Sequence, residues 1–483
     1  MSEEILINVT PQETRVALVE NGVLQEVHIE RARQRGTVGN IYKGRVARIL
    51  PGMQAAFVDI GATRAAFLHV AEMLPAAEGV NPDAIHERLH EGDEIVVQVM
   101  KDPLGTKGAR LTMQITLPAR YLVYLPYSKH IGISQKIGDD AERERLRGLL
   151  RAAIGEDDAG GYILRTLAET VEEEEIRKDV RYLRRAWEIA CQRIREVPVG
   201  TLIHEELPLV LRTLRDLVRE ETEKMRVDSR EFFAKASEFA QEFVPEMRER
   251  IEHYPGERPI FDLYSVEDEI RKALGRKVLL KSGGYVVIDQ TEAMTTIDVN
   301  TGAYVGKHNL EETLFKTNLE AAQTIARQLR LRNLGGIILV DFIDMADPEH
   351  KRQVSRALEK AVARDRNKVT FSEMSPLGLV ELTRKRTRES LEHVLCQPCP
   401  VCQGRGSLRT AQTVCYEIFR EILREARQYG ANEYLVLASQ VVVDMLMDEE
   451  AASLVGLQEF IRRPIQLKVE PAYHQEQYDV VLL

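Results

Sequence analysis

Cysteine, tryptophan and long apolar runs are scarce in this chain of 483 residues. Five cysteines in a chain of this length do not make a disulfide framework, which agrees with a reducing compartment. No apolar run reaches the length that spans a bilayer, and the opening sequence MSEEILINV is acidic where a signal peptide would be basic. These absences argue against a secreted or transmembrane protein, and we expect a cytoplasmic one.

The composition is that of a soluble globular protein without an excess of positive charge. Hydrophobic residues make up 44% and charged residues 29% of the chain, and the length suggests about three domains. The net charge of −10 argues against a surface that binds nucleic acid all over, but it permits local basic patches. Such clusters occur at Arg45 and Arg48, Lys101–Arg110, Arg364–Lys368 and Arg384–Arg388.

The first part of the chain is rich in short predicted strands. Alternating apolar residues on both sides of Asn21-Gly22 predict a β-hairpin over residues 14–30. A second pair of strands is predicted around a Pro51-Gly52 turn, and further alternating segments follow at 92–102 and 108–115. Short strands with glycines at their corners are typical of a small closed barrel rather than an open sheet.

Two phenylalanines on adjacent strands of this barrel are candidate RNA contacts. Phe57 and Phe67 each follow a small residue, and Lys107 is one of the basic residues nearby in the sequence. Exposed aromatic rings on an OB-type barrel stack on the bases of single strands, while lysine and arginine follow the backbone. The residues alone leave open whether both rings belong to the core. The basic surroundings favour an RNA-binding barrel.

Two strands that end in carboxylates, joined by one long helix, form the most informative pattern in the chain. The first strand is predicted over Tyr285–Asn300 and the second over Gly335–Asp344. The helix between them, roughly Asn309–Arg332, begins with a capping pattern and ends at two glycines. A strand–helix–strand unit is most simply a parallel crossover, which brings both strand ends to one edge of the sheet.

The polar residues at these strand ends are a candidate magnesium site. Alternation places Asp298 and Asn300 on one face, and Asp341 ends the apolar run of the second strand. Carboxylate and amide oxygens are the ligands that Mg²⁺ prefers, and the ion there could orient a water and stabilise charge on a phosphoryl group. A lone strand-end aspartate is most often a turn cap. Alternation turns Asp344 away from Asp341, which predicts a structural role for Asp344.

A candidate phosphate pocket follows a short strand in the middle of the chain. Arg165-Thr166 ends a predicted strand that begins after Gly160-Gly161. A guanidinium and a hydroxyl beside exposed backbone amides suit a phosphate group. A surface arginine at a strand end is the simpler interpretation, and without other information the residues favour it.

The cysteine cluster near residue 400 has the spacing of a zinc knuckle. Cys399 and Cys402 enclose two residues and are followed by a glycine-rich turn. A closed structural zinc site needs four ligands, and the chain has no second pair at this spacing. Either two chains each contribute a pair, or Cys396 or His393 is recruited locally.

Taken in order, these motifs closely resemble the ribonuclease E/ribonuclease G family over essentially the whole chain. The similarity is carried by IDQTEAMTTIDVNTGA, ARQLRLRNLGGII, RKRTRESLEHVLC and the ending EQYDVVLL. The resemblance implies an α+β multidomain fold with a ribonuclease-H-like subdomain split between residues 1–35 and 207–275, an S1-type OB barrel over 36–118, a 5′-end sensor over 119–206, a DNase-I-like catalytic α/β domain over 276–396, a zinc-link over 397–409 and a small domain over 410–483.

The resemblance also implies roles for individual residues. Asp298 and Asp341 would bind the catalytic Mg²⁺ with support from Asn300. Cys399 and Cys402 would bind a structural Zn²⁺ shared between two chains. The remaining implied positions are the RNA-binding residues Phe57, Phe67 and Lys107, and the readers of a 5′-monophosphate, Arg165, Thr166 and the backbone at Val123.

The implied activity is magnesium-dependent endonucleolytic cleavage of single-stranded, AU-rich RNA with a preference for 5′-monophosphorylated ends, leaving a 5′-phosphate and a 3′-hydroxyl. The implied biology is 5′-end maturation of the small ribosomal RNA and message turnover, by a homo-oligomer that is a dimer or tetramer. Ala119 stands where ribonuclease E carries glycine, and Gln135-Lys136 replaces an arginine pair, so the strength of sensing stays open. The alternative is a non-catalytic RNA-binding or ribosome-assembly factor whose carboxylates are structural.

Overall fold

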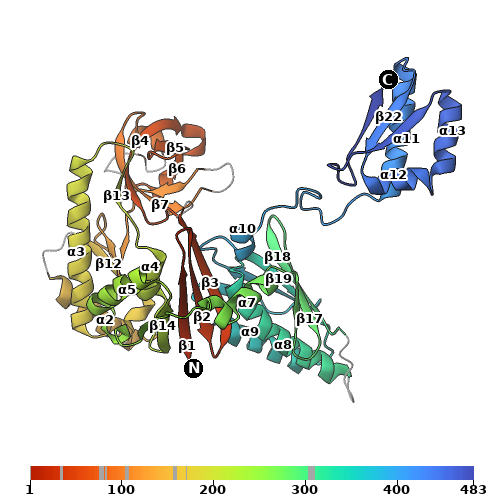
Figure 1. Ribbon diagram of the computed structural model, residues 1–483. Coiled ribbons are helices and arrows are strands. Elements are labelled where there is room, and N and C mark those ends of the chain that lie inside the picture. The colour runs from red at the N-terminus through yellow and green to blue at the C-terminus, as the bar shows by residue number, and fades with distance from the viewer. Residues whose placement is uncertain are drawn as a thin grey trace. The chain divides into compact units, whose positions relative to one another are not determined.

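The chain forms two compact units, Met1–Val394 and Leu395–Leu483. The computed structural model describes residues 2–32, 36–75, 81, 84–103, 108–155, 160–169, 171–302 and 310–483 (Figure 1). Both units mix helices with sheets, as predicted for an α+β protein. Of the helices in these ranges, none is long and apolar enough to cross a membrane.

A five-stranded sheet joins the N-terminal residues to a segment much later in the chain. Its strands, in sheet order, are β15 (Ile251–His253), β14 (Thr222–Val227), β1 (Glu3–Val9), β2 (Glu13–Glu20) and β3 (Val23–Arg31). The β2–β3 hairpin turns at Asn21 and Gly22, which both have positive φ, so the predicted turn is confirmed. The helices of this region are α4 (Leu209–Asp216), α5 (Arg230–Phe243), α6 (Ile260–Leu263) and α7 (Val266–Ala273).

A five-stranded barrel follows, and it is closed, as predicted. The pairing runs from β4 through β5, β6, β8 and β7 back to β4. The bounds are β4 (Ile41–Leu50), β5 (Ala55–Asp59), β6 (Ala66–His69), β7 (Glu94–Lys101) and β8 (Arg110–Thr112), with α1 (Ile85–Arg88) before β7. Val58, Leu68 and Leu111 are among the buried residues of its interior. β13 (Thr201–His204) pairs with β4 and extends this sheet.

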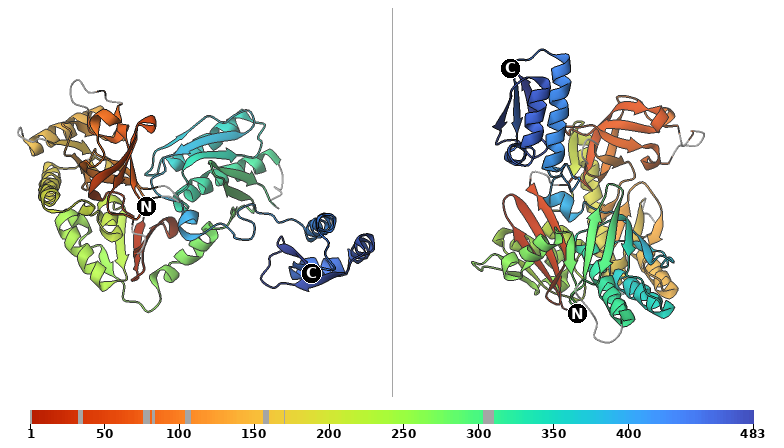
Figure 2. Two further views of the ribbon diagram at one scale, coloured as in Figure 1. Left: turned by 90° about the horizontal axis from the view of Figure 1, so that it is seen from above. Right: turned by 90° about the vertical axis from the view of Figure 1, so that its right-hand side faces the viewer.

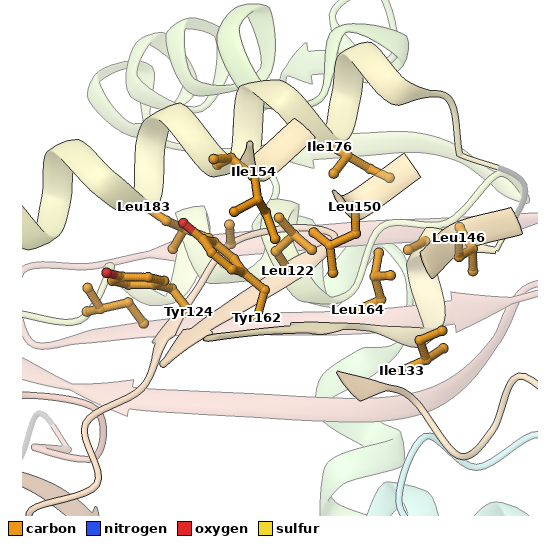
Figure 3. Close-up of a cluster of buried hydrophobic side chains, with 14 of the residues drawn as sticks. Leu122, Tyr124, Ile133, Leu146, Leu150, Ile154, Tyr162, Leu164, Ile176 and Leu183 are labelled. Carbon is orange, nitrogen blue, oxygen red and sulfur yellow. The ribbon is translucent and has the colours of Figure 1, made fainter. Parts of the chain in front are cut away.

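The segment between the barrel and α4 forms a small sheet packed against two long helices. The strands, in sheet order, are β11 (Ile131–Ile133), β12 (Gly161–Leu164), β10 (Leu122–Leu125) and β9 (Leu117–Pro118), and the helices are α2 (Asp140–Ile154) and α3 (Glu173–Glu196). Figure 3 shows Leu150 of α2 and Leu183 of α3 beside Leu122 and Leu164 of the sheet. This core fixes the end of β12, from which Arg165 emerges.

A six-stranded sheet carries the predicted metal site. Its strands, in sheet order, are β16 (Lys277–Leu279), β17 (Tyr285–Gln290), β18 (Met294–Asn300), β19 (Gly336–Asp341), β21 (Leu379–Arg384) and β20 (Val369–Phe371). Helices α8 (Leu310–Leu331) and α9 (Pro348–Val362) pack on one face, over residues such as Ile297, Ile338 and Val340 (Figures 1 and 2). The alternate residues of β17, β18 and β19 point to the opposite face and are exposed or half-buried.

Residues 285–300 form a hairpin rather than the single strand that was predicted. β17 and β18 pair antiparallel, and between them the backbone N–H and the hydroxyl of Thr291 both donate to the Met294 carbonyl. The turn carries no glycine or proline, so the usual sequence signal of a turn is missing. Alternation still holds within β18, and Asp298 and Asn300 share one face as predicted.

The second unit contains one three-stranded sheet with three helices after the cysteine cluster. Its strands, in sheet order, are β23 (Ile465–Val469), β22 (Tyr434–Ala438) and β24 (Tyr478–Leu482), and the helices are α11 (Ala411–Gln428), α12 (Gln440–Met447) and α13 (Ala451–Ile461). Val414, Ile418 and Ile422 of α11 contribute to its buried core. A short helix, α10 (Leu391–Leu395), precedes the cysteine cluster. The finer division of the first unit into the named subdomains remains a prediction.

The His28 imidazole lies in a half-buried polar cluster that joins β3 to the segment after β21. Its Nε2 is 3.3 Å from a Glu26 carboxylate oxygen and 3.4 Å from the Arg388 guanidinium. Burial, followed by the charge of Arg388, lowers the pKa of His28 from 6.5 to about 4. The folded protein therefore keeps this side chain neutral at pH values where the unfolded chain protonates it.

We expect the first unit to lose stability as the pH falls below 6.5. The contribution of His28 is fully present above pH 6.5 and is lost as the pH falls toward the folded pKa of about 4, because the unfolded state binds the proton first. When the pH falls from 7 to 5, protonation linked to His28 should lower the free energy of unfolding by about 2 kcal/mol. Urea unfolding of the wild type and His28→Gln at both pH values measures it. Equal losses in the two proteins would contradict the assignment.

Candidate active site

Asp298 and Asp341 meet at one edge of the six-stranded sheet, with Asn300 beside them. β18 and β19 run parallel, with Asp298 directly opposite Asp341, at the usual strand separation of about 4.8 Å. The Asn300 amide donates a hydrogen bond of 2.7 Å to an Asp298 carboxylate oxygen. Both aspartates are exposed and Asn300 is half-buried. The predicted parallel crossover and the predicted meeting of the two carboxylates are confirmed.

Two adjacent carboxylates without a positive partner suit a divalent cation. Desolvation, and then the negative charges of Asp298 and Asp344, raise the pKa of Asp341. Among the described side chains, none forms an ion pair with Asp298 or Asp341. These oxygen donors fit Mg²⁺, which commonly takes one or two carboxylates and completes its shell with water and phosphate oxygens. Within the same ranges, no cluster of three or more His, Cys, Asp or Glu side chains is arranged to hold a metal.

The strand alternation that was used to place Asp344 does not extend to this residue. β19 ends at Asp341, so the three residues that follow have left the sheet and the alternation argument does not apply to them. The charge of Asp344 is near enough to contribute to the raised pKa of Asp341. Strand alternation therefore gives no basis for turning Asp344 away from Asp341, and the structural role of Asp344 stays a prediction.

A buried asparagine that the sequence reasoning missed holds the loop after Asp341. The side chain of Asn318, in α8, is fully buried; its amide donates to the Ile343 carbonyl at 2.8 Å and accepts from the Ile343 N–H at 3.1 Å. Glu311, at the start of α8, accepts from the backbone N–H groups of Ala346 and Asp347. A sequence signal existed, because Asn318 has helical spacing to the core residues around Ala321 and Ala322.

Phe57 and Phe67 face each other across β5 and β6 of the barrel. Their ring centroids are 6.2 Å apart at an interplanar angle of 69°. Both rings are half-buried, so they are not the buried core residues that the sequence left as an alternative. Exposed Arg48 lies beside Phe57, and exposed Arg110 beside Phe67, in the same cross-strand row. Lys107 lies outside the described residues.

Arg165 and Thr166 follow β12 of the small sheet, and Val123 lies on the neighbouring strand β10. Arg165 directly follows β12, and Val123 of β10 pairs with Ile163, two residues before Arg165. The exposed Thr166 hydroxyl is 2.9 Å from the Ser134 hydroxyl, on the other side of β12. The structure thus brings together the three residues predicted to sense a 5′-phosphate, and their role stays a prediction.

The Arg165 guanidinium is held in place by two acceptors from outside its strand. It donates to the Ala119 carbonyl at 2.6 Å and pairs with an Asp216 carboxylate oxygen at 2.7 Å. Burial opposes ionisation of Asp216, but the charges of Arg215 and Arg165 outweigh it and keep its pKa below the ordinary value. Lys136, one of the two residues that depart from ribonuclease E, donates to a main-chain carbonyl after α9 at 2.7 Å.

Cys399 and Cys402 come together in a tight turn of the second unit. Hydrogen bonds from the backbone N–H groups of Gly406 and Gly404, and then one from the Cys399 thiol, lower the pKa of the Cys402 thiol. A lowered thiol pKa favours the thiolate form that binds zinc. Cys396 is exposed in the same segment and forms no disulfide. Two thiols fit half of a structural zinc site.

The folds and the paired carboxylates define a multidomain α+β protein. Its exposed carboxylate oxygens, at the ends of two neighbouring strands, suit a divalent cation. Residues 116–387 match the model of the Ribonuclease E/G family, and residues 398–482 match the model of the RNase E/G thioredoxin-like domain. The chain therefore belongs to the ribonuclease E/G family.

Curated relatives agree with this assignment over the full length. Ribonuclease G of Salmonella typhimurium (strain SL1344) and ribonuclease G of Escherichia coli (strain K12) are each 53% identical over 491 aligned positions, covering 100% of this chain and 100% of each relative. Ribonuclease E of Escherichia coli (strain K12) is 37% identical over 469 positions, covering 94% of this chain and 44% of that protein. The similarity to the ribonuclease G proteins thus spans both units.

Proposed function

We propose that this chain is a magnesium-dependent endoribonuclease that cleaves single-stranded, AU-rich RNA and prefers a 5′-monophosphorylated end. Endonucleolytic hydrolysis of RNA follows from membership of the ribonuclease E/G family. The observation that carries the magnesium proposal is the exposed Asp298–Asp341 pair without a positive partner among the described side chains. The alternative of a non-catalytic RNA-binding factor is set aside, because the relatives at 53% identity are ribonucleases.

Asp298, Asp341 and Asn300 have different proposed roles in hydrolysis. Asp298 and Asp341 would hold the cation, and Asn300 orients Asp298 through its amide hydrogen bond. Mg²⁺ held there would supply a Lewis acid and lower the pKa of a bound water. Hydrolysis forms a bond from a water oxygen to phosphorus and breaks the bond from phosphorus to the 3′ oxygen, which gains a proton in place of the one that the water loses. The products carry a 5′-phosphate and a 3′-hydroxyl.

Two further surfaces of the first unit support binding of a single strand. The row of Arg48, Phe57, Phe67 and Arg110 offers aromatic rings for base stacking between two guanidinium groups. The fixed Arg165 offers a planar donor to a terminal phosphate. We propose that the barrel row holds the RNA and that Arg165, with Thr166 and the backbone at Val123, reads the 5′-monophosphate.

We also propose that Cys399 and Cys402 bind Zn²⁺ jointly with the same pair of a second chain, which makes the active protein a homo-oligomer. Only two thiols converge in the described turn, and a structural zinc needs four ligands. Native mass spectrometry should find one zinc per two chains, whereas one zinc per chain would exclude sharing. The proposed cellular roles are maturation of the 5′ end of the small ribosomal RNA and message turnover in the cytoplasm.

The proposal is tested by incubating the purified chain with a 5′-monophosphorylated, AU-rich RNA oligonucleotide in Mg²⁺ or in EDTA. Cleavage should occur in Mg²⁺, stop in EDTA and return when excess Mg²⁺ is added. The downstream product should accept ligation through its 5′-phosphate. Cleavage that continues unchanged in EDTA, or products with a 3′-phosphate, would overturn the mechanism.

The Asn318→Leu substitution should raise the Mg²⁺ concentration needed for half-maximal cleavage by about 10- to 100-fold, as expected for loss of a residue that positions metal ligands. Leucine has a similar volume but leaves the Ile343 N–H and carbonyl without their buried partner. The loop between Asp341 and Asp344 then loses its fixed position. A magnesium titration of the cleavage rate measures the shift.

Thr317→Val is the matched control for Asn318→Leu. Thr317 is its equally buried neighbour, and the hydrogen bond that its hydroxyl makes among the described residues goes to the Thr313 carbonyl inside α8. This substitution removes a buried hydrogen bond without touching the loop, so the magnesium requirement should stay at the wild-type value. An equal shift in both variants would show that the effect is general destabilisation of α8.

A further inference from the structure

The outward face of the catalytic sheet carries more than the two carboxylates. Strand registers place Lys277 of β16, Val287 of β17, Asp298 and Asp341 in one row across the sheet. In the next row, Tyr285 lies directly beside Asn300. With strands about 4.8 Å apart, Tyr285 is one strand from Asn300 and Lys277 is about 10 Å from Asp298. Aromatic and cationic side chains therefore flank the proposed cleavage centre.

The Lys277 ammonium rests on the Tyr285 ring. Its Nζ lies 3.6 Å from the ring centroid, and Lys277 is exposed. In the part of the chain that the structure describes, no carboxylate forms an ion pair with Lys277. Among the described residues, the Tyr285 ring is the partner that the structure gives this cation, in a protein whose acidic side chains outnumber its basic ones, 76 to 66. The Lys277 ammonium can therefore leave the ring and pair with an incoming phosphate.

An exposed leucine extends this surface. Leu279 of β16 pairs with Tyr285 and is 73% exposed, although it is a large apolar side chain. Isolated exposed leucines are ordinary, but this one continues an aromatic side chain toward the edge of the sheet. The face beside Asn300 thus offers an aromatic ring, an apolar rim and an unpaired cation, which are the groups that bind a nucleotide of a single strand.

We propose that Lys277 and Tyr285 form a nucleotide subsite next to the cleavage centre, which rests on the proposed endoribonuclease function. The Tyr285 ring stacks on the base of a nucleotide adjacent to the scissile phosphate, and the Lys277 ammonium moves from the ring to a neighbouring phosphate. The exchange is favourable, because base stacking on an aromatic side chain is stronger than an exposed cation–π contact. The subsite positions the chain across Asp298 and Asp341.

The test combines substitutions at Tyr285 with RNA that lacks one base. Steady-state cleavage is measured for the wild type, Tyr285→Ala and Tyr285→Phe, on RNA that is intact or abasic at the nucleotide on either side of the scissile phosphate. With intact RNA, Tyr285→Ala should raise KM by about 5- to 150-fold, the equivalent of the stacking energy. Tyr285→Phe should behave as wild type, because the ring is retained.

The abasic RNA decides whether the ring acts on the base. If Tyr285 stacks on that base, wild type and Tyr285→Ala should have the same KM on one of the two abasic RNAs. An equal increase in KM on intact and on both abasic RNAs, or no increase on any, would overturn the proposal. Failure of the wild type to cleave any RNA would instead contradict the proposed function itself.

The Lys277→Gln substitution tests whether the positive charge of Lys277 contributes to RNA binding. It should raise KM and reduce by about one the slope of log affinity against log salt concentration. Lys235→Gln is the matched control: Lys235 also lies over a ring, that of Phe232 at 5.1 Å, but it is on α5 and is ion-paired with Glu231. This control should leave KM and the salt slope unchanged. If Lys277→Gln changes the native mass of the protein and not its salt slope, the face joins copies of the chain and the proposal is wrong.

Discussion

The Asp298→Asn substitution is expected to lower the rate of RNA cleavage by about a thousandfold and to leave RNA binding at its wild-type strength. An amide has the size of the carboxylate but removes one of the two charges that we propose to hold Mg²⁺. Loss of several kcal/mol of metal-derived transition-state stabilisation corresponds to about three powers of ten in rate. Single-turnover cleavage and fluorescence anisotropy with the same RNA separate chemistry from binding.

Asp289→Asn is the matched control for Asp298→Asn. Asp289 projects from the same outward face of the hairpin, but it is ion-paired with Arg276 instead of facing Asp341. The same chemical change there should leave the cleavage rate near that of the wild type. Unchanged cleavage by Asp298→Asn would show that this carboxylate is structural. Parallel loss of cleavage and RNA binding would point to damage to the fold.

Removal of the Arg165 side chain should abolish discrimination between RNA ends. We expect the wild type to cleave a 5′-monophosphorylated RNA faster than the same RNA with a 5′-triphosphate, and Arg165→Ala to bring the ratio of the two rates close to one. Charge-assisted hydrogen bonds contribute about 1.5–3 kcal/mol each, so the loss should be about 10- to 100-fold and confined to the monophosphorylated RNA. Competition of both RNAs in one reaction measures the ratio directly.

Two further variants sharpen the interpretation of Arg165→Ala. Arg165→Lys keeps the charge but loses the planar fork that contacts Ala119 and Asp216, so it should recover only part of the discrimination. Arg177→Ala removes an exposed arginine of α3 that pairs with Glu173 one turn away, and it should change nothing. If Arg165→Ala leaves the rate ratio of the wild type intact, the sensor assignment is wrong.

Local sequence patterns were sufficient to predict the core of the candidate site. Alternation in β18 and the apolar run that ends at Asp341 placed two carboxylates at the ends of parallel strands, and the register confirms it. The Asn21-Gly22 turn was equally predictable, because few residues besides asparagine and glycine adopt its backbone angles readily. In both cases the determining interactions lie within a few residues or within one strand–helix–strand unit.

Features that depend on where a strand ends were harder to predict. The 285–300 segment has no glycine or proline at its turn, and the antiparallel pairing of β17 with β18 shows that the chain reverses direction there. Because β19 stops at Asp341, alternation does not assign a face to Asp344, whose charge contributes to the raised pKa of Asp341. Strand alternation predicts which face a residue occupies only while the strand continues.

Contacts between distant segments could not be predicted from the sequence. Asn318 holds Ile343 in the loop after Asp341, 25 residues away along the chain, and Arg165 pairs with Asp216 of α4. Whether Phe57 and Phe67 were core or surface also depended on the closure of the barrel, which fixes the face that each ring occupies. Such pairs are set by tertiary packing, for which a single sequence gives no direct signal.

The most direct measurement of the central claim is the position of a divalent cation in crystals soaked with Mn²⁺, a stand-in for Mg²⁺ that anomalous scattering identifies. We predict one peak between the carboxylates of Asp298 and Asp341, about 2.0–2.3 Å from an oxygen of each, and its loss in crystals of Asp298→Asn. An anomalous peak bound elsewhere in the first unit, with none between these carboxylates, would contradict the assignment of the cleavage centre.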